Sequence, residues 1–313
     1  MANNQPLDAY GKLEDAIDHV VASYDGRHEI DSLESAALPN RRAVIEALNH
    51  LKPAIYLGFY SRKSLTRSSL RFCVSEHLYP AYDILTEQIH RAVTYNDLYH
   101  LRQDPRPREW SQGAVLSLFQ RLPEIRNQLN RDVLTAYRGD PAAKTVEEVI
   151  FSYPAIEAIT IYRVAHELYM QEVPMIPRIM SEYGHSETGI DIHPGAQIGE
   201  CFFIDHGTGT VIGQTAVIGN NVKLFHGVTL GALSSPHKTD KGEEAAAMKR
   251  HPTIEDDVII YSGATILGGD TVIGRGSVIG GNAWLTQSVP PGTKITYDAR
   301  FTVAATRKDA AHS

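Results

Sequence analysis

The chain has 313 residues, of which 42% are hydrophobic and 21% are charged, and its formal net charge is −7. This composition is typical of soluble globular proteins, and the length allows one large domain or two ordinary ones. Because the basic residues form no block, the chain lacks the counterion-releasing surface that nucleic acid or an anionic membrane would require. We therefore expect small-molecule or protein partners.

The first residues, MANNQPLDAYGKLEDAIDHVV, have no cationic end followed by an apolar run. No window reaches the roughly 18 apolar residues of a membrane span, so the cytoplasm is the expected location. Cys73 and Cys201 lack CxxC spacing and are too few for a disulfide framework. Cys201 is close to His206 in sequence, so a thiol nucleophile is possible, but a small buried residue is favoured because no neighbouring feature would activate the thiol.

The first half of the chain, from about Leu7 to Gly184, spaces its apolar residues as helices do. In the stretches 40–60 and 147–171 they recur three or four positions apart, which places them on one helical face. Pro39 with Asn40, the stretch DPRPREW, and GDPAA at 139–143 mark breaks between helices. This half is predicted to be an α domain.

The second half has a different period, because after Gly189 an aliphatic residue recurs every six positions. The series slips by two residues after Ile204 and by one after Ile266. Its members are Ile192, Ile198, Ile204, Ile212, Ile218, Leu224, Leu230, Ile254, Ile260, Ile266, Ile273, Ile279 and Leu285. A six-residue period suits a triangular β-solenoid in which each side uses one hexapeptide. A glycine-rich β-sandwich would not keep this interval.

The predicted fold class is therefore α+β, an N-terminal all-α helical domain followed by a left-handed parallel β-helix. We expect residues 1–188 to serve assembly and part of the substrate site, and residues 189–292 to form the catalytic prism. Residues 233–250 lack an inward aliphatic row, so they are predicted to be an extruded loop, and such loops often line sites. Residues 293–313 are predicted to be a C-terminal tail.

The stretch FFIDHGTG at 202–209 raises three possibilities for His206: a base, a metal ligand or a turn residue. An imidazole is the natural acceptor for the proton of an attacking alcohol, and a carboxylate behind it would fix its tautomer. Asp191 precedes His206 by 15 residues, close to one coil of about 18 residues, so a solenoid can stack the two on neighbouring rungs. The hexapeptide prism by itself does not show whether His206 is a base or a metal ligand, since acyltransferases and a zinc-binding carbonic anhydrase class share this fold.

The choice between these protein classes rests on four motifs taken together: DIHP at 191–194, IDHGTG at 204–209, GVTLGA at 227–232 and RHP at 250–252. In this order after a helical domain, they resemble the serine O-acetyltransferase family over roughly residues 139–292. The resemblance implies acetyl transfer from acetyl-CoA to the L-serine hydroxyl, giving O-acetyl-L-serine for cysteine biosynthesis, with His206 and Asp191 as a catalytic dyad. Two alternatives remain open: another acceptor such as homoserine or a sugar, and a solenoid scaffold without catalysis.

The resemblance also implies a set of substrate-binding residues. Asp205 and Asp140 would hold the amino acid, while Arg250 and His251 would grip its carboxylate from a neighbouring subunit. Each has a plainer reading. Asp205 could be a solvated turn carboxylate, Asp140 a helix N-cap before Pro141, and Arg250 a solvated loop residue.

The positions that the family uses for coenzyme A correspond here to Gly231, Ala232, Ser262, Gly263 and Ala264. Small residues allow a pantetheine arm to approach the main chain. Tyr261-Ser262 replaces the usual Gly-Ala pair, so we expect the acyl-donor contacts to differ from those of the family. The chain lacks the HxxxxH pair of the zinc-binding class, so no metal is expected.

The resemblance finally implies a homotrimer or a dimer of trimers, with L-cysteine as feedback inhibitor. Many members of the family bind the next enzyme through a C-terminal isoleucine. This chain ends RKDAAHS, without an aliphatic anchor, so we expect no cysteine synthase complex through the tail.

Overall fold

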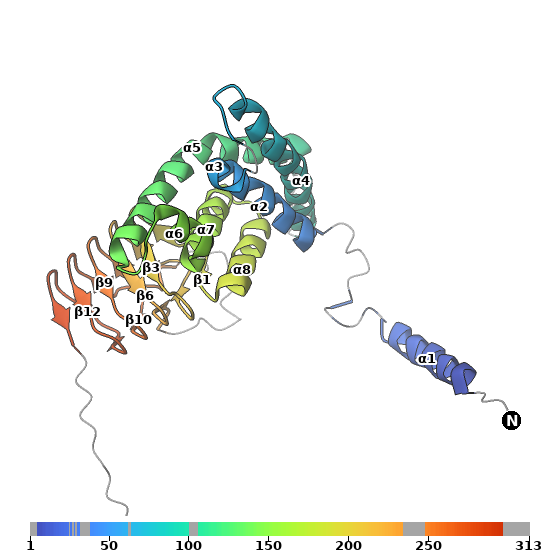
Figure 1. The fold of residues 1–313 in the computed structure, drawn as a ribbon. Helices are drawn as coiled ribbons and strands as arrows, with labels where there is room; N and C mark the ends of the chain where they lie inside the picture. Colours follow the sequence, from blue (N-terminus) through green and yellow to red (C-terminus); the bar gives the residue numbers. More distant parts are fainter. Residues whose placement is uncertain are drawn as a thin grey trace, which may run out of the picture.

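The structure is a computed structural model that describes residues 5–24, 26, 28, 30–31, 38–61, 64–99, 106–233 and 248–296. A group of helices is followed by a stack of short strands that forms a parallel solenoid (Figure 1). The predicted order, an all-α half and then a parallel β-helix, is confirmed. Most of the predicted loop 233–250 and of the tail 293–313 lies outside the described residues.

Eight helices precede the solenoid in the described part of the chain. They are α1 Gln5–Ala22, α2 Arg41–Ile55, α3 Leu57–Tyr60, α4 Leu70–Tyr99, α5 Arg108–Gly139, α6 Val146–Ser152, α7 Pro154–Met170 and α8 Ile176–Thr188. The predicted break at Asn40 is the N-cap of α2, where the side chain accepts hydrogen bonds from the amides of Arg42 and Ala43 at 2.8 and 3.3 Å. No helix among these is long and apolar enough to cross a membrane.

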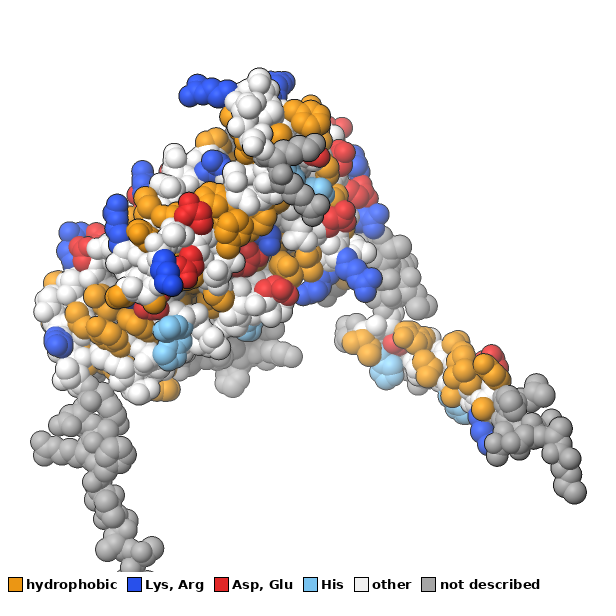
Figure 2. Space-filling view, viewed as in Figure 1, with side chains coloured by type: hydrophobic (Ala, Val, Ile, Leu, Met, Phe, Trp, Pro, Cys, Tyr) orange, Lys and Arg blue, Asp and Glu red, His pale blue; other side chains and the backbone are white. Residues whose placement is uncertain are grey.

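Helix α1 differs from the others because it lies apart from them and exposes an apolar stripe (Figures 1 and 2). The exposed apolar side chains of α1 are Tyr10, Leu13, Ile17, Val20 and Val21. Their spacing of three and four residues is that of a helix face that normally packs against a partner.

The strands form three parallel sheets, one on each side of the prism. Sheet A contains β1 Asp191–Ile192, β4 Val211–Ile212, β7 Thr229–Gly231, β10 Thr265–Leu267 and β13 Trp284–Leu285. Sheet B contains β2 Gln197–Ile198, β5 Val217–Ile218, β8 Thr253–Ile254 and β11 Val272–Ile273. Sheet C contains β3 Phe203–Asp205, β6 Lys223–Phe225, β9 Ile259–Ile260, β12 Val278–Ile279 and β14 Lys294–Ile295.

The register of these sheets confirms the predicted six-residue repeat. In sheet A, Ile192 aligns with Ile212, Ile212 with Leu230, and Leu230 with Ile266. Aliphatic residues align in the same way in sheets B and C. Nearly all of them are buried, so the repeat builds a continuous apolar column inside the prism.

Two corners of the prism matter for the site. The turns from sheet C to sheet A, residues 206–210, 226–228 and 261–264, are here called the His206 corner. The turns from sheet A to sheet B, residues 193–196, 213–216 and 248–252, are called the His251 corner. The first slip of the repeat falls in the His206 corner, where five residues join β3 to β4 but three join β6 to β7.

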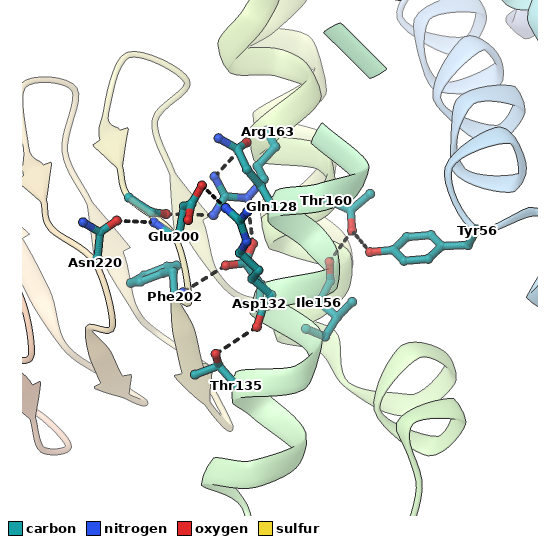
Figure 3. A network of polar contacts seen from close by, with 12 residues as sticks. Tyr56, Gln128, Asp132, Thr135, Ile156, Thr160, Arg163, Glu200, Phe202 and Asn220 are labelled. Atoms are coloured by element: carbon teal, nitrogen blue, oxygen red, sulfur yellow. Dashed lines mark hydrogen bonds and ion pairs between the residues drawn. The ribbon is translucent and has the colours of Figure 1, made fainter. Parts of the chain in front are cut away.

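The helical half is fixed to the first coil by a buried ion pair (Figure 3). Arg163 of α7 donates to Asp132 of α5 at 2.7 Å, and the two side chains are 4% and 0% exposed. Both then reach the coil: the Phe202 amide donates to Asp132 at 2.9 Å, and Arg163 donates to the Gly199 carbonyl at 2.9 Å. The end of α5 is therefore held against β3.

Candidate active site

His206 occupies the enlarged turn between β3 and β4. Its φ is +60°, a left-handed conformation that is uncommon for residues other than glycine, and φ at Gly207 is +92°. A Cβ on Gly207 would lie 2.4 Å from Ile190 Cδ1, so the turn requires glycine there. The turn leaves the His206 side chain 75% exposed. Strained backbone that presents a polar side chain to solvent is a common feature of functional sites.

Asp205 lies beside His206 and is far less exposed. Its Oδ1 is 3.7 Å from His206 Nε2, and its side chain is 14% exposed. Its Oδ2 forms an ion pair with Lys223 Nζ at 2.9 Å. The plainer reading of Asp205 as a solvated turn carboxylate is therefore wrong.

Asp140 faces the same place from the helical half. It is the C-cap of α5, and Thr145 is the N-cap of α6, so the reading of Asp140 as a helix N-cap is wrong. The carboxylate accepts a hydrogen bond from the Tyr153 hydroxyl at 2.5 Å and another from the Ala142 amide at 2.8 Å. These bonds lower the pKa of Asp140, with small further contributions from Lys223 and His206, and they raise that of Tyr153 to about 12.

Asp191 starts β1, one rung before the His206 corner. Its amide donates to the Thr210 carbonyl at 2.9 Å, and its Cα pairs with that of Val211, directly after the enlarged turn. Asp191 therefore lies one rung from the end of the turn that holds His206. No hydrogen bond between Asp191 and His206 is found among the described residues, so the dyad stays a prediction.

The His251 corner holds the second predicted pair. Arg250 donates to the Gln214 side-chain oxygen at 2.5 Å, and its amide donates to the Thr215 hydroxyl at 2.9 Å. His251 is 8% exposed and accepts a hydrogen bond from the Thr215 amide on Nδ1 at 3.1 Å. Arg250 is therefore an ordered residue of the prism surface and not a freely solvated one.

Burial lowers the pKa of His251 to about 4, and the charges of Arg250 and Lys249 act in the same direction. The ring is therefore neutral near pH 7. Because Nδ1 accepts from the Thr215 amide, the proton of the neutral ring is on Nε2. His251 can thus donate one hydrogen bond to an anion without carrying a charge.

These two corners do not meet within one chain. Asp140, Asp205 and His206 gather where sheet C turns into sheet A, whereas Arg250 and His251 contact Gln214 and Thr215, where sheet A turns into sheet B. A ligand that touches both groups needs the His251 corner of another copy.

The predicted coenzyme A residues flank sheet A. Ser262, Gly263 and Ala264 belong to the His206 corner, where the Gly263 amide donates to the His226 carbonyl at 3.0 Å. Gly231 ends β7 on the side of the His251 corner, and Ala232 follows it. Beside the first group, the ring of Tyr261 stacks on Phe225 with centroids 4.9 Å apart. The replacement noted in the sequence thus places an aromatic ring at the edge of the site.

Three residues of the site were missed by sequence reasoning: Lys223, Tyr153 and Phe225. Tyr153 follows the GDPAA motif by ten residues, and at this separation the sequence does not show that its hydroxyl bonds to Asp140. Lys223 and Phe225 flank the inward Leu224, which marks them as outward-facing. The period shows that they point out of the prism, but not what lies opposite them.

Two other histidines of the solenoid, His193 and His226, have structural contacts. His193 is a turn residue, as predicted: its Nδ1 accepts from the Gly195 amide at 3.0 Å, and burial lowers its pKa to about 4. The His226 ring lies 5.8 Å from that of His206 in an edge-on arrangement. Among the residues that the structure describes, no group of three or more His, Cys, Asp or Glu side chains could hold a metal ion.

A scan against protein-family models finds no match. Curated proteins do match. The chain is 44% identical over 272 residues to a serine acetyltransferase of Synechococcus elongatus described as plasmid, covering 86% of this chain and 85% of the relative. It is also 48% identical over 140 residues to the serine acetyltransferase of Bacillus subtilis, covering 45% of this chain and 60% of the relative.

Solved structures give the same result. A crystal structure of serine acetyltransferase isoform 3 from Entamoeba histolytica, in complex with cysteine, is similar with a TM-score of 0.68 and 35% identity, covering 82% of each chain. Serine acetyltransferase 1 of the same organism, in complex with L-cysteine, has a TM-score of 0.68 and 32% identity, covering 82% of this chain and 86% of that one. The similarity includes both the helices and the solenoid.

Proposed function

The chain belongs to the serine acetyltransferase family, and on that premise we propose that acyl transfer takes place at the His206 corner with His206 as general base. The protein is an acyltransferase that acetylates serine. The observation that carries the proposal is the convergence of Asp140, Asp205 and an exposed His206 from two domains.

The proposed reaction needs one group that both accepts and returns a proton. His206 takes the serine hydroxyl proton as the oxygen attacks the thioester carbonyl of acetyl-CoA, and a tetrahedral intermediate forms. When that intermediate collapses, the C–S bond breaks and the imidazolium gives its proton to the departing sulfur. The products are O-acetyl-L-serine and free coenzyme A. Asp191, one rung away, would stabilise the imidazolium.

Recognition of the amino acid divides between the corners. The carboxylates of Asp140 and Asp205 suit the serine ammonium group. The guanidinium of Arg250 and the Nε2–H of His251 suit its carboxylate, and both would come from the neighbouring copy. We therefore propose a homotrimer in which each site uses the corners of two chains, and the exposed stripe of α1 favours further assembly through the helices.

Acetyl-CoA would lie between the two groups of small residues that flank sheet A, near Gly231 and Gly263. L-Cysteine has the ammonium and carboxylate groups of serine, so the same contacts would hold it. The bound cysteine in two similar structures supports cysteine as an inhibitor of this chain.

The test is release of free thiol from acetyl-CoA with a panel of alcohols. Serine should be the best acceptor, ahead of homoserine and of sugar hydroxyls, because only an α-amino acid with a short side chain meets both corners. Release that is faster with homoserine or a sugar would assign another acceptor. Absence of release with every alcohol would favour the non-catalytic scaffold.

A further inference from the structure

Lys223 lies in sheet C, next to the His206 corner, but has no role in the chemistry described so far. It is the first residue of β6, and its side chain is 22% exposed. Its Nζ donates to the Gly139 carbonyl at 2.9 Å and pairs with Asp205 Oδ2 at 2.9 Å. One ammonium group thus connects the end of α5 to the carboxylate beside His206.

The packing around Lys223 holds the ammonium group in that position. Its Nζ lies 4.7 Å from the ring centre of Phe203 and 4.6 Å from that of Phe225, within cation–π range. The Phe203 ring also lies against Gly139, where an added Cβ would be 3.1 Å from the ring. The aromatic rings therefore limit the ammonium group to the space between the two domains.

The charges around His206 show why such a cation is useful. Asp205 lies next to His206, Asp140 faces it from the end of α5 with Tyr153 bonded behind, and His226 adds a second imidazole. Two carboxylates brought to one site repel each other unless a cation lies between them. Lys223 leaves the pair with one net negative charge, which matches one substrate ammonium.

We propose that Lys223 is a positioning residue that holds Asp205 and Asp140 at the spacing needed for the amino group of the acceptor. The proposal rests on the proposed function, since it assigns the carboxylates to that amino group. Lys223 would thereby affect how tightly the acceptor binds and how readily His206 becomes protonated, with little effect on the acyl donor.

The central variant is Lys223→Met, which keeps the length of the aliphatic side chain and removes the charge. The expected result is an increase of about tenfold or more in KM for serine, with KM for acetyl-CoA changed less than about twofold. The acid limb of the kcat/KM profile for serine should move to higher pH, because the Asp205 carboxylate, without Lys223, stabilises the positively charged imidazolium. Lys223→Arg keeps the charge and should recover most of the affinity.

Lys144→Met is the matched control, because it removes one exposed cation from the loop between α5 and α6, four residues from Asp140. It should leave both KM values and the pH profile unchanged. If Lys223→Met does not fold, Lys223→Gln, which keeps a donor for the Gly139 carbonyl, is measured in its place. Unchanged serine KM and pH profile in the folded variant would overturn the proposal.

Two results separate this proposal from the proposed function. If the wild-type protein acetylates serine but the Lys223 variants behave like it, only the positioning role is wrong. If the wild-type protein releases no thiol with serine, the function itself is wrong. Equal increases in both KM values, without rescue by Lys223→Arg, would indicate a general loss of structure and would also contradict the positioning role.

Discussion

The two corners of the prism hold their histidines in opposite ways. At the His206 corner the imidazole is 75% exposed, on a strained turn, and has carboxylates beside it. At the His251 corner the imidazole is 8% exposed, neutral, and fixed by the Thr215 amide. The first ring is open to solvent and to a substrate, whereas the second can only donate a hydrogen bond.

This difference arises from irregular places in a regular fold. The rungs repeat every six residues and build the core, whereas the turn at His206 has two extra residues and presents its side chain to solvent. At the second slip, Gly269 passes so close to the Lys249 carbonyl that an added Cβ would lie 2.2 Å from it. The same added Cβ would lie 3.0 Å from the Arg250 amide nitrogen, so the second slip lies directly beside Arg250 and His251. Interruptions of the repeat therefore mark the site.

The largest expected effect is at the exposed ring. His206→Ala should lower turnover by roughly two to four orders of magnitude, as loss of general-base catalysis does. Steady-state thiol release from acetyl-CoA measures it. Because the side chain is 75% exposed, the thermal unfolding midpoint should change little. Near-normal turnover in the variant would show that the exposed imidazole of the His206 corner is not the general base.

The second largest effect is expected at the buried ion pair that fixes the helical half to the first coil and so places Asp140 near the His206 corner. Arg163→Met leaves the Asp132 carboxylate buried without its partner and should cost about 3–5 kcal/mol in the free energy of unfolding. Denaturant titration measures this loss. Arg121→Met on the same pair of helices is the control, because its ion pair with Glu167 is half exposed and should contribute less than about 1 kcal/mol. Equal losses would show that the buried pair has no special role.

The corners also differ in how far the sequence predicts them. The aliphatic repeat predicts the prism and both slips, since the inward side chains have one environment on every rung. Asp205, His206, Arg250 and His251 stand out because their motifs lie in or beside turns. The sequence thus identifies the corners, but it does not show that they are separate in one chain.

Contacts between the helical half and the solenoid could not be predicted from the sequence. Lys223 meets Gly139 across 84 positions, and Asp132 meets Phe202 across 70. Neither helical nor six-residue periodicity carries information about which outward-facing residues will meet. The reading of Asp140 as an N-cap failed for a related reason: Pro141 suggested a helix start, but the next helix begins only after Thr145.

A smaller effect is expected from crowding the His251 corner alone. Gly213→Ala places a Cβ 1.9 Å from His251 Cδ2, so the ring must move from its place. We expect KM for serine to rise by about tenfold while His206-dependent turnover at saturating serine is largely kept. Gly58→Ala, where an added Cβ meets nothing within 4 Å, is the control. A loss of kcat equal to that of His206→Ala would show that the corners do not act separately.

The smallest effect concerns acid stability. Burial lowers the pKa values of His193 and His251 to about 4, against 6.5 for an unperturbed histidine. Between about pH 6.5 and pH 4 the unfolded chain therefore binds more protons than the folded chain. The contribution of each neutral ring to the free energy of unfolding is fully present above about pH 6.5 and decreases as the pH falls toward 4. Each histidine should contribute about 1 kcal/mol after allowance for solvent screening.

Denaturant unfolding at pH 7 and pH 5 measures this contribution. The His251→Gln variant should show a smaller decrease between the two values than the wild-type protein. His185→Gln, at an exposed position on α8, should show the wild-type decrease. Equal pH dependence in all three proteins would contradict the assignment of a buried neutral ring.

The central claim is that each site joins the His206 corner of one chain to the His251 corner of another. The direct test mixes two inactive proteins, His206→Ala and Arg250→Ala, and measures serine acetylation in verified mixed trimers. In a trimer that contains both variants, about one site in three combines an intact His206 with an intact Arg250, so activity should return to about a third of the wild-type value in mixed trimers, or about a quarter in the whole random mixture. No recovery in mixed trimers would mean that the two residues act within one chain, and the account would be wrong.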